Sequence, residues 1–135
     1  MLRAAFEKEK MKFSRYTFLI AAIYGLLALA PQYFLEAKTG RDFPPAITHP
    51  EYYYGFTGVA LAWQIAFLII SREPARYRPM MIPAMFEKFS FGIAAIVLFW
   101  QNRLPAMMLG AGILDLILGA LFVAAFLKTK ERREA

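Results

Sequence analysis

Residues 106–127 of the chain read AMMLGAGILDLILGALFVAAFL, and this stretch decides the fold. A helix needs about 20 apolar residues to cross a bilayer, and Asp115 is the only charged residue in this stretch. A carboxylate at that depth costs roughly 3 kcal/mol or more unless it faces protein or water. Gly112 and Gly119 lie on the same helix face as Asp115, because residues three and four apart share a side. We therefore expect a membrane-crossing helix that packs through an acidic, glycine-bearing face.

The composition extends this expectation to the whole chain. It has 135 residues, of which 59% are apolar, and its mean hydropathy is +0.43. Soluble domains are nearer 45–50% apolar, and here the excess falls in four blocks. The sequence therefore predicts one membrane domain over residues 1–135. The absence of cysteine excludes disulfides, thiolate chemistry and iron–sulfur clusters.

Four spans are predicted, at about residues 15–35, 52–71, 83–101 and 106–127. Residues 1–14 read either as a helix lying on the membrane surface or as a frayed charged tail, and residues 128–135 as a charged cytoplasmic tail. Between the first two spans we expect a long loop over residues 36–51, because Gly40 and the pair Pro44-Pro45 interrupt helices. The predicted fold class is an all-α, antiparallel, four-helix membrane bundle.

The basic residues predict the orientation of this bundle. The net charge is +6, and all but three of the sixteen Lys and Arg residues fall on one side of the predicted spans. The exceptions are Lys38, Arg41 and Arg103. The positive-inside rule then places both termini in the cytoplasm, in a bacterial cytoplasmic membrane. Anionic lipid headgroups explain the positive charge, and we expect no nucleic-acid partner.

Each predicted span carries one polar stripe, and lipid cannot satisfy these groups, so we expect the stripes to meet inside the bundle. Near the midplane, Asp115 would accept hydrogen bonds from the Tyr24 hydroxyl and the Gln64 amide. Glu87 would lie nearer the cytoplasm, in an ion-pair network with Lys88 and the basic turn. The candidate ligand-binding residues are Asp115, Gln64, Tyr24, Tyr53, Thr57 and Glu87. The alternative is that the uncharged members only hold helices together.

No cofactor or metal site is predicted. His49 is the only histidine, and with Glu51 alone beside it the chain lacks the ligands of a zinc site. A ridge of small residues on the second span, Gly58, Ala62 and Ala66, would let another helix approach closely. It offers a surface for a homodimer or for a larger membrane complex.

Three segments carry a resemblance to known families: HPEYYYGFTGVALAWQIAFLI from residue 49, REPARYRPMMIPAMFEKFSFG from residue 72 and LDLILGALFVAAFL from residue 114. In these segments and in layout the chain resembles small four-span bacterial membrane proteins of the DoxX-like group. More distantly it is similar to the emopamil-binding-protein superfamily, which includes sterol isomerases and lipophilic-amine binders. Both resemblances imply a helical membrane bundle, and the second implies acidic residues facing an internal pocket.

Three functions are compatible with these patterns. The first is a non-enzymatic protein that binds a lipophilic small molecule or a lipid between its helices, or that serves as an accessory subunit of a membrane complex. The second is a small proton-coupled transporter that uses Asp115. The third is a membrane enzyme, such as a lipid isomerase with Asp115 or Glu87 as general acid–base, and we rank it last.

Overall fold

The computed structural model describes residues 2–129, and every element in that range is helical. In chain order they are α1 (Leu2–Leu29), η1 (Ala30–Phe34), α2 (Glu36–Asp42), α3 (Pro50–Arg72), η2 (Arg78–Met80), α4 (Met81–Trp100) and α5 (Ala106–Lys128). Four segments are long and apolar enough to cross a membrane: Lys8–Phe34, Pro50–Arg72, Arg78–Trp100 and Ala106–Lys128. The predicted all-α class and the four apolar spans are confirmed.

The structure differs from the predicted boundaries in two places. Residues 2–14 are not a separate surface helix, because α1 runs unbroken to Leu29 and meets its first glycine only at Gly25. The predicted loop contains α2, in which Gly40 is buried and lets the chain at Ala46 return close by. In both places strong helix formers outweigh the expected break. Residues 130–135 of the predicted tail lie outside the described residues.

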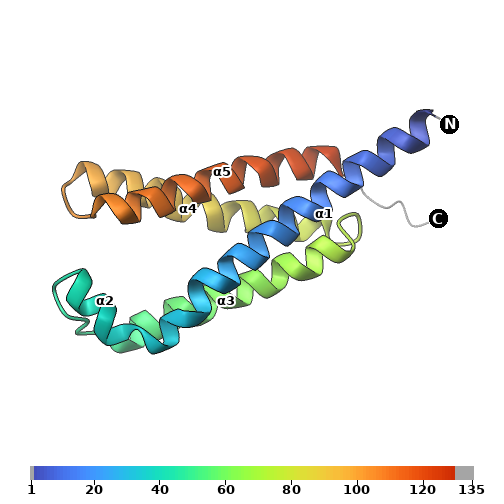
Figure 1. Ribbon diagram of the computed structural model, residues 1–135. Helices are drawn as coiled ribbons and strands as arrows, with labels where there is room; N and C mark the ends of the chain where they lie inside the picture. Colours follow the sequence, from blue (N-terminus) through green and yellow to red (C-terminus); the bar gives the residue numbers. More distant parts are fainter. Residues whose placement is uncertain (1, 130–135) are drawn as a thin grey trace.

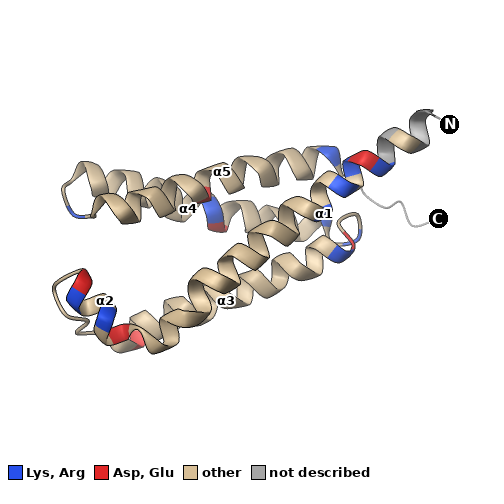
Figure 2. Cartoon of the chain, viewed as in Figure 1, with Lys and Arg blue, Asp and Glu red and all other residues tan. Residues whose placement is uncertain are grey.

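The helices are arranged as two pairs (Figure 1). α1 packs mainly against α3, and α4 packs mainly against α5. The pairs meet where α1 lies beside α5, near the two termini, and they diverge toward the opposite end. We call the first the basic end, since Lys8–Arg15, Arg72–Arg78 and Lys128 lie there, and the second the hairpin end, which holds residues 30–49 and 101–105 (Figure 2).

A cluster of aromatic rings joins the two pairs in the half nearer the basic end. The rings of Phe18 and Phe122 stack with centroids 4.1 Å apart, and the Phe67 ring meets Phe122 edge-on at 5.0 Å. All three side chains are fully buried. The remaining buried apolar side chains of this core are Ala21, Ala22, Ile70, Met81, Ala84, Leu118 and Ala125. Burial of three phenylalanines therefore holds α1, α3 and α5 together there, and Met81 and Ala84 bring α4 into the same core.

Hydrogen bonds tie the helix ends at the basic end. Ser14 of α1 bonds the Ala125 carbonyl at 3.2 Å and the Thr129 hydroxyl at 2.7 Å. The Arg78 guanidinium donates to the Thr129 carbonyl at 2.7 Å and lies over the Phe126 ring. Carbonyl groups at the C-terminus of α5 thus receive side-chain donors and a positive charge, which stabilises a helix end.

Glycines allow α4 and α5 to approach closely. A Cβ atom on Gly112 would lie 2.3 Å from the Ala95 Cβ, and one on Gly92 would lie 2.5 Å from the Leu116 side chain. A Cβ on Gly110 would meet nothing within 4 Å. Gly112 and Gly92 therefore set the separation of the pair, as small residues do between membrane helices.

These distances predict opposite outcomes for two neighbouring substitutions. We expect Gly112→Ala to lower the free energy of unfolding by about 1–3 kcal/mol, because the new methyl group overpacks against Ala95. Gly110→Ala, two residues away, should leave stability unchanged or raise it, because alanine favours the helix. Thermal unfolding in detergent, followed by circular dichroism, measures both. Equal losses in the two variants would contradict the close approach.

Candidate functional site

One group of charged residues lies away from the helix ends, in the middle of α4 and α5 (Figure 2). It consists of Glu87 and Lys88 on α4 and Asp115 on α5, and we call it the charge cluster. Lys88 lies near the middle of the Arg78–Trp100 span and Asp115 near the middle of the Ala106–Lys128 span. Charged side chains at such a depth are rare and usually functional.

Lys88 stands between the two carboxylates. Its Nζ donates to Asp115 Oδ1 at 3.1 Å and lies 3.3 Å from Glu87 Oε2. The Lys88 side chain is only 6% exposed, against 14% for Asp115 and 21% for Glu87. On its α3 side the ammonium lies 5.5 Å from the centroid of the Phe67 ring. The cation is therefore enclosed by two acids and one aromatic face.

The two carboxylates are held differently. Asp115 accepts a hydrogen bond from Lys88, whereas the Glu87 contact is an ion pair without hydrogen-bond geometry. Glu87 Oε2 is a buried oxygen with no hydrogen-bond partner among the described residues. The cluster holds two acids and one base, so one Lys88 cannot neutralise both carboxylates.

The sequence builds the cluster by placing glycine opposite lysine. A Cβ on Gly119 would lie 3.3 Å from the Lys88 Cβ and 3.1 Å from the Phe89 ring, so Gly119 makes room for the lysine stem. One helical turn before Gly119, Asp115 meets the ammonium at the end of that stem. The expected face of Gly112, Asp115 and Gly119 therefore does turn inward, and its partner is α4.

The predicted midplane trio is not assembled. Asp115 bonds Lys88 and not the Tyr24 hydroxyl or the Gln64 amide, so this expectation was wrong. Tyr24 is 41% exposed. The Gln64 amide donates to the Ala60 carbonyl of its own helix, and its buried Oε1 has no partner among the described residues. The reason is the pairing of helices: α1 and α3 carry Tyr24 and Gln64, while Asp115 packs inside the other pair.

Tyr53 and Thr57 lie in the half of α3 nearer the hairpin end. The Tyr53 hydroxyl donates to the Gln32 carbonyl at 2.8 Å, and the Thr57 hydroxyl donates to the Tyr53 carbonyl. The first bond fastens α3 to η1, and the second lies within α3. The structure places neither residue at the charge cluster.

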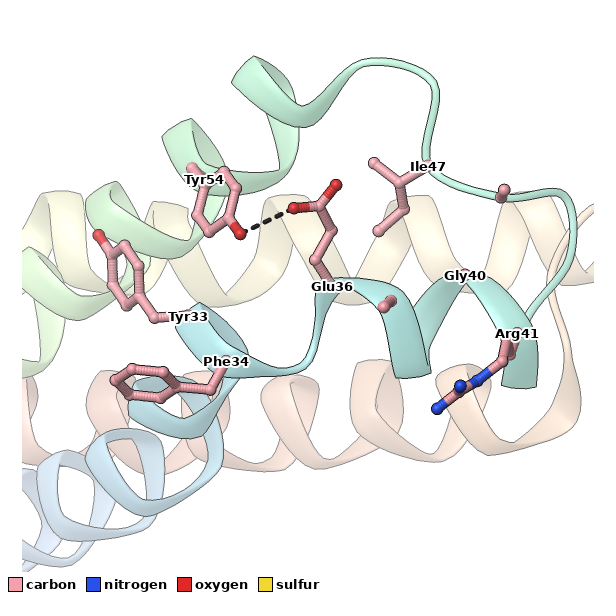
Figure 3. A pocket seen from close by; sticks show the side chains of 9 residues that line it. Tyr33, Phe34, Glu36, Gly40, Arg41, Ile47 and Tyr54 are labelled. Atoms are coloured by element: carbon pink, nitrogen blue, oxygen red, sulfur yellow. Dashed lines mark hydrogen bonds between the residues drawn. The ribbon is translucent and has the colours of Figure 1, made fainter.

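A surface pocket of about 600 Å³ opens at the hairpin end between η1, α2 and the start of α3 (Figure 3). Within it the Tyr54 hydroxyl donates to Glu36 Oε2 at 2.7 Å, and Tyr33 stacks on Tyr54. In Figure 3 the Arg41 side chain points away from that carboxylate. The pocket is wide open, and its carboxylate is already bonded to Tyr54.

A second hollow, of about 500 Å³, is a mainly apolar groove between α1 and α5. Six of its lining residues are Phe13, Tyr16, Thr17, Ile20, Leu118 and Leu121. Neither this groove nor the pocket at the hairpin end is lined by Asp115 or Glu87. Within residues 2–129, no group of three His, Asp or Glu side chains could hold a metal ion.

Lys88 is the functional candidate that sequence reasoning missed. With the third span starting at Pro83, Glu87 and Lys88 fell in its first turns and read as interfacial. The helix begins at Met81, after η2, because a proline is tolerated in the first turn. The short connection between α4 and α5 is the signal that could have identified it. Counting residues outward from this connection along both helices places Lys88 within one helical turn of the level of Asp115.

Comparison with known proteins adds no family to this picture. No family model matches the chain, and neither curated proteins nor solved structures give a match.

The geometry predicts strong coupling between Lys88 and Asp115. Lys88→Met alone should destabilise the protein by about 3–5 kcal/mol, because it leaves two largely enclosed carboxylates without a cation. Adding Asp115→Leu should recover a substantial part of that loss. A double-mutant cycle on unfolding in detergent measures the coupling. Losses that simply add would contradict a direct Lys88–Asp115 interaction.

Proposed function

We propose that this chain is an integral membrane protein that acts as a small proton-coupled transporter, with the charge cluster as its proton-binding site. The observation that carries the proposal is a buried lysine shared by two carboxylates near the middle of two membrane spans. Intramembrane acids and bases of this kind are typical of proton relays and transport pathways.

The charge balance defines what the cluster binds. With Glu87, Lys88 and Asp115 all ionised, its net charge is −1, and an uncompensated charge in the membrane interior is expensive. One proton on a carboxylate makes the cluster neutral. Asp115 holds the hydrogen bond from Lys88, while Glu87 Oε2 has no hydrogen bond and its side chain is 21% exposed. Glu87 is therefore the group that takes up and releases the proton.

Infrared spectroscopy tests the proton site directly. We expect the reconstituted protein to show the carbonyl band of a protonated carboxylic acid that disappears as pH is raised, and Glu87→Gln to remove this band. Glu51→Gln, at an exposed position, is the matched control and should keep it. A wild-type protein without the band at any pH at which it is folded would overturn the proposal, as would a band that survives Glu87→Gln.

Transport is tested in proteoliposomes that contain a pH-sensitive dye. An imposed potassium diffusion potential should drive proton entry through the wild-type protein. Glu87→Gln should reduce the rate to that of empty vesicles, because it removes the titrating group and keeps the Lys88–Asp115 pair. Unchanged entry in Glu87→Gln, with Glu51→Gln as the folded control, would rule out Glu87 as the coupling residue.

Binding of a lipophilic molecule or a lipid is the second candidate function, and the groove between α1 and α5 favours it. Its apolar wall and the single hydroxyls of Tyr16 and Thr17 suit an acyl chain with a polar end. The site proposed here is this groove on the outside of α1 and α5, whereas the sequence suggested a pocket around Asp115.

A photoactivatable fatty acid tests the groove. We expect it to label peptides that contain Tyr16 and Leu121, and we expect Leu121→Trp to reduce the labelling severalfold by filling the hollow. Ile93→Trp, at an exposed apolar position on α4, is the control and should leave labelling unchanged. Equal labelling in both variants would remove this candidate.

We further propose a homodimer or a larger complex through the ridge on α3, since four helices rarely enclose a transport path alone. Ala62 is exposed, while Gly58 already faces the Tyr33 hydroxyl. The isomerase hypothesis has less support, because Glu87 and Asp115 are both engaged by the same Lys88 ammonium. The proposed location is a bacterial cytoplasmic membrane with the basic end in the cytoplasm, in line with the resemblance to the DoxX-like group.

A further inference from the structure

A basic hollow of about 330 Å³ lies at the basic end, between α1 and the turn that follows α3. Five basic residues line it with a single acid, Glu73, and two small residues and one methionine complete its wall. The basic residues are Lys8, Lys12, Arg15, Arg72 and Arg76. They come from two segments that are far apart in the sequence, so packing of α1 on α3 is what gathers the positive charge.

A neighbouring hollow of about 400 Å³ shares residues with it. Arg15 and Arg72 line both hollows, and Leu19, Leu68 and Ser71 complete the second. Leu19 and Leu68 lie one turn further into the membrane spans Lys8–Phe34 and Pro50–Arg72 than the two arginines do. Positive charge at the headgroup level is thus continuous with an apolar surface at the level of the acyl chains.

Ion pairs with neighbouring acids neutralise only part of the positive charge of these five basic residues. Arg15 uses one nitrogen, Nη2, to cap the Arg72 carbonyl at the end of α3 at 3.1 Å. Lys12 pairs with Glu9 at 3.3 Å and Arg76 with Glu73 at 3.7 Å, and all four of these side chains are about half exposed or more. Exposed pairs of this kind contribute little and exchange readily.

We propose that these two hollows form a binding site for an anionic phospholipid, with its phosphate among the five basic side chains and one acyl chain against Leu19 and Leu68. Arginine suits a phosphate because its planar fork donates two parallel hydrogen bonds. The site lies outside the charge cluster and does not rest on proton transport. Either proposal can fail without the other.

Native mass spectrometry of the full chain, released from nanodiscs that contain equal phosphatidylglycerol and phosphatidylcholine, tests the site. We expect the wild-type protein to retain phosphatidylglycerol in preference. Arg72→Gln with Arg76→Gln should weaken that retention roughly thirtyfold, since each basic residue near the surface contributes about 1 kcal/mol. Arg72→Lys with Arg76→Lys should keep most of it. Circular dichroism and gel filtration establish that each variant is folded.

Two control experiments distinguish a specific lipid-binding site from general electrostatic attraction of the protein to anionic lipid. Lys38→Gln with Arg41→Gln removes the same charge at the hairpin end and should leave retention unchanged. Inorganic phosphate at the same concentration should not displace the lipid, because it has no acyl chain to contact Leu19 and Leu68. The proposal is overturned if the two double glutamine variants lose retention equally, if the wild-type protein shows no preference, or if free phosphate competes as well as the lipid.

Discussion

The structure depends on one electrostatic constraint, which is that Lys88 is buried between two helices and must be neutralised there. An ammonium with 6% of its side chain exposed has no water to solvate it, so α4 must present it to an acid on α5. The 3.1 Å bond to Asp115 fixes how far the two helices can slide past each other. Gly92, Gly112 and Gly119 then follow as the positions where the backbones must come close enough for that bond to form.

Phe67 links this pair of helices to the other. Its ring faces the Lys88 ammonium on one side and packs against Phe122 in the common core. Because an aromatic face attracts a cation, the charge cluster and the aromatic core stabilise each other across α3, α4 and α5. Toward the hairpin end, no such aromatic contact joins the two helix pairs within residues 2–129, and the pairs diverge there.

Local sequence patterns could predict which segments form helices, but they could not predict which helices pack against each other. Apolar length was enough to place α3 and α5 to within a few residues, and glycine spacing was enough to turn Asp115 inward. Tyr24 was misplaced because aligning polar stripes assumes that all four helices face one axis, while these helices pack in pairs. Gln64 satisfies its amide within its own helix, through Ala60, and sequence spacing does not distinguish that bond from one across helices.

The charge cluster contains more acid than is needed to hold α4 against α5. A single Lys–Asp pair would neutralise itself and would hold α4 against α5 without help. Glu87 adds a second negative charge beside the same lysine, in a position where its buried oxygen gains no hydrogen bond among the described residues. That charge weakens the assembly unless a proton or a ligand cation neutralises it. Adhesion therefore accounts for Asp115 and Lys88, and the excess acid at Glu87 is the feature on which the proposed function rests.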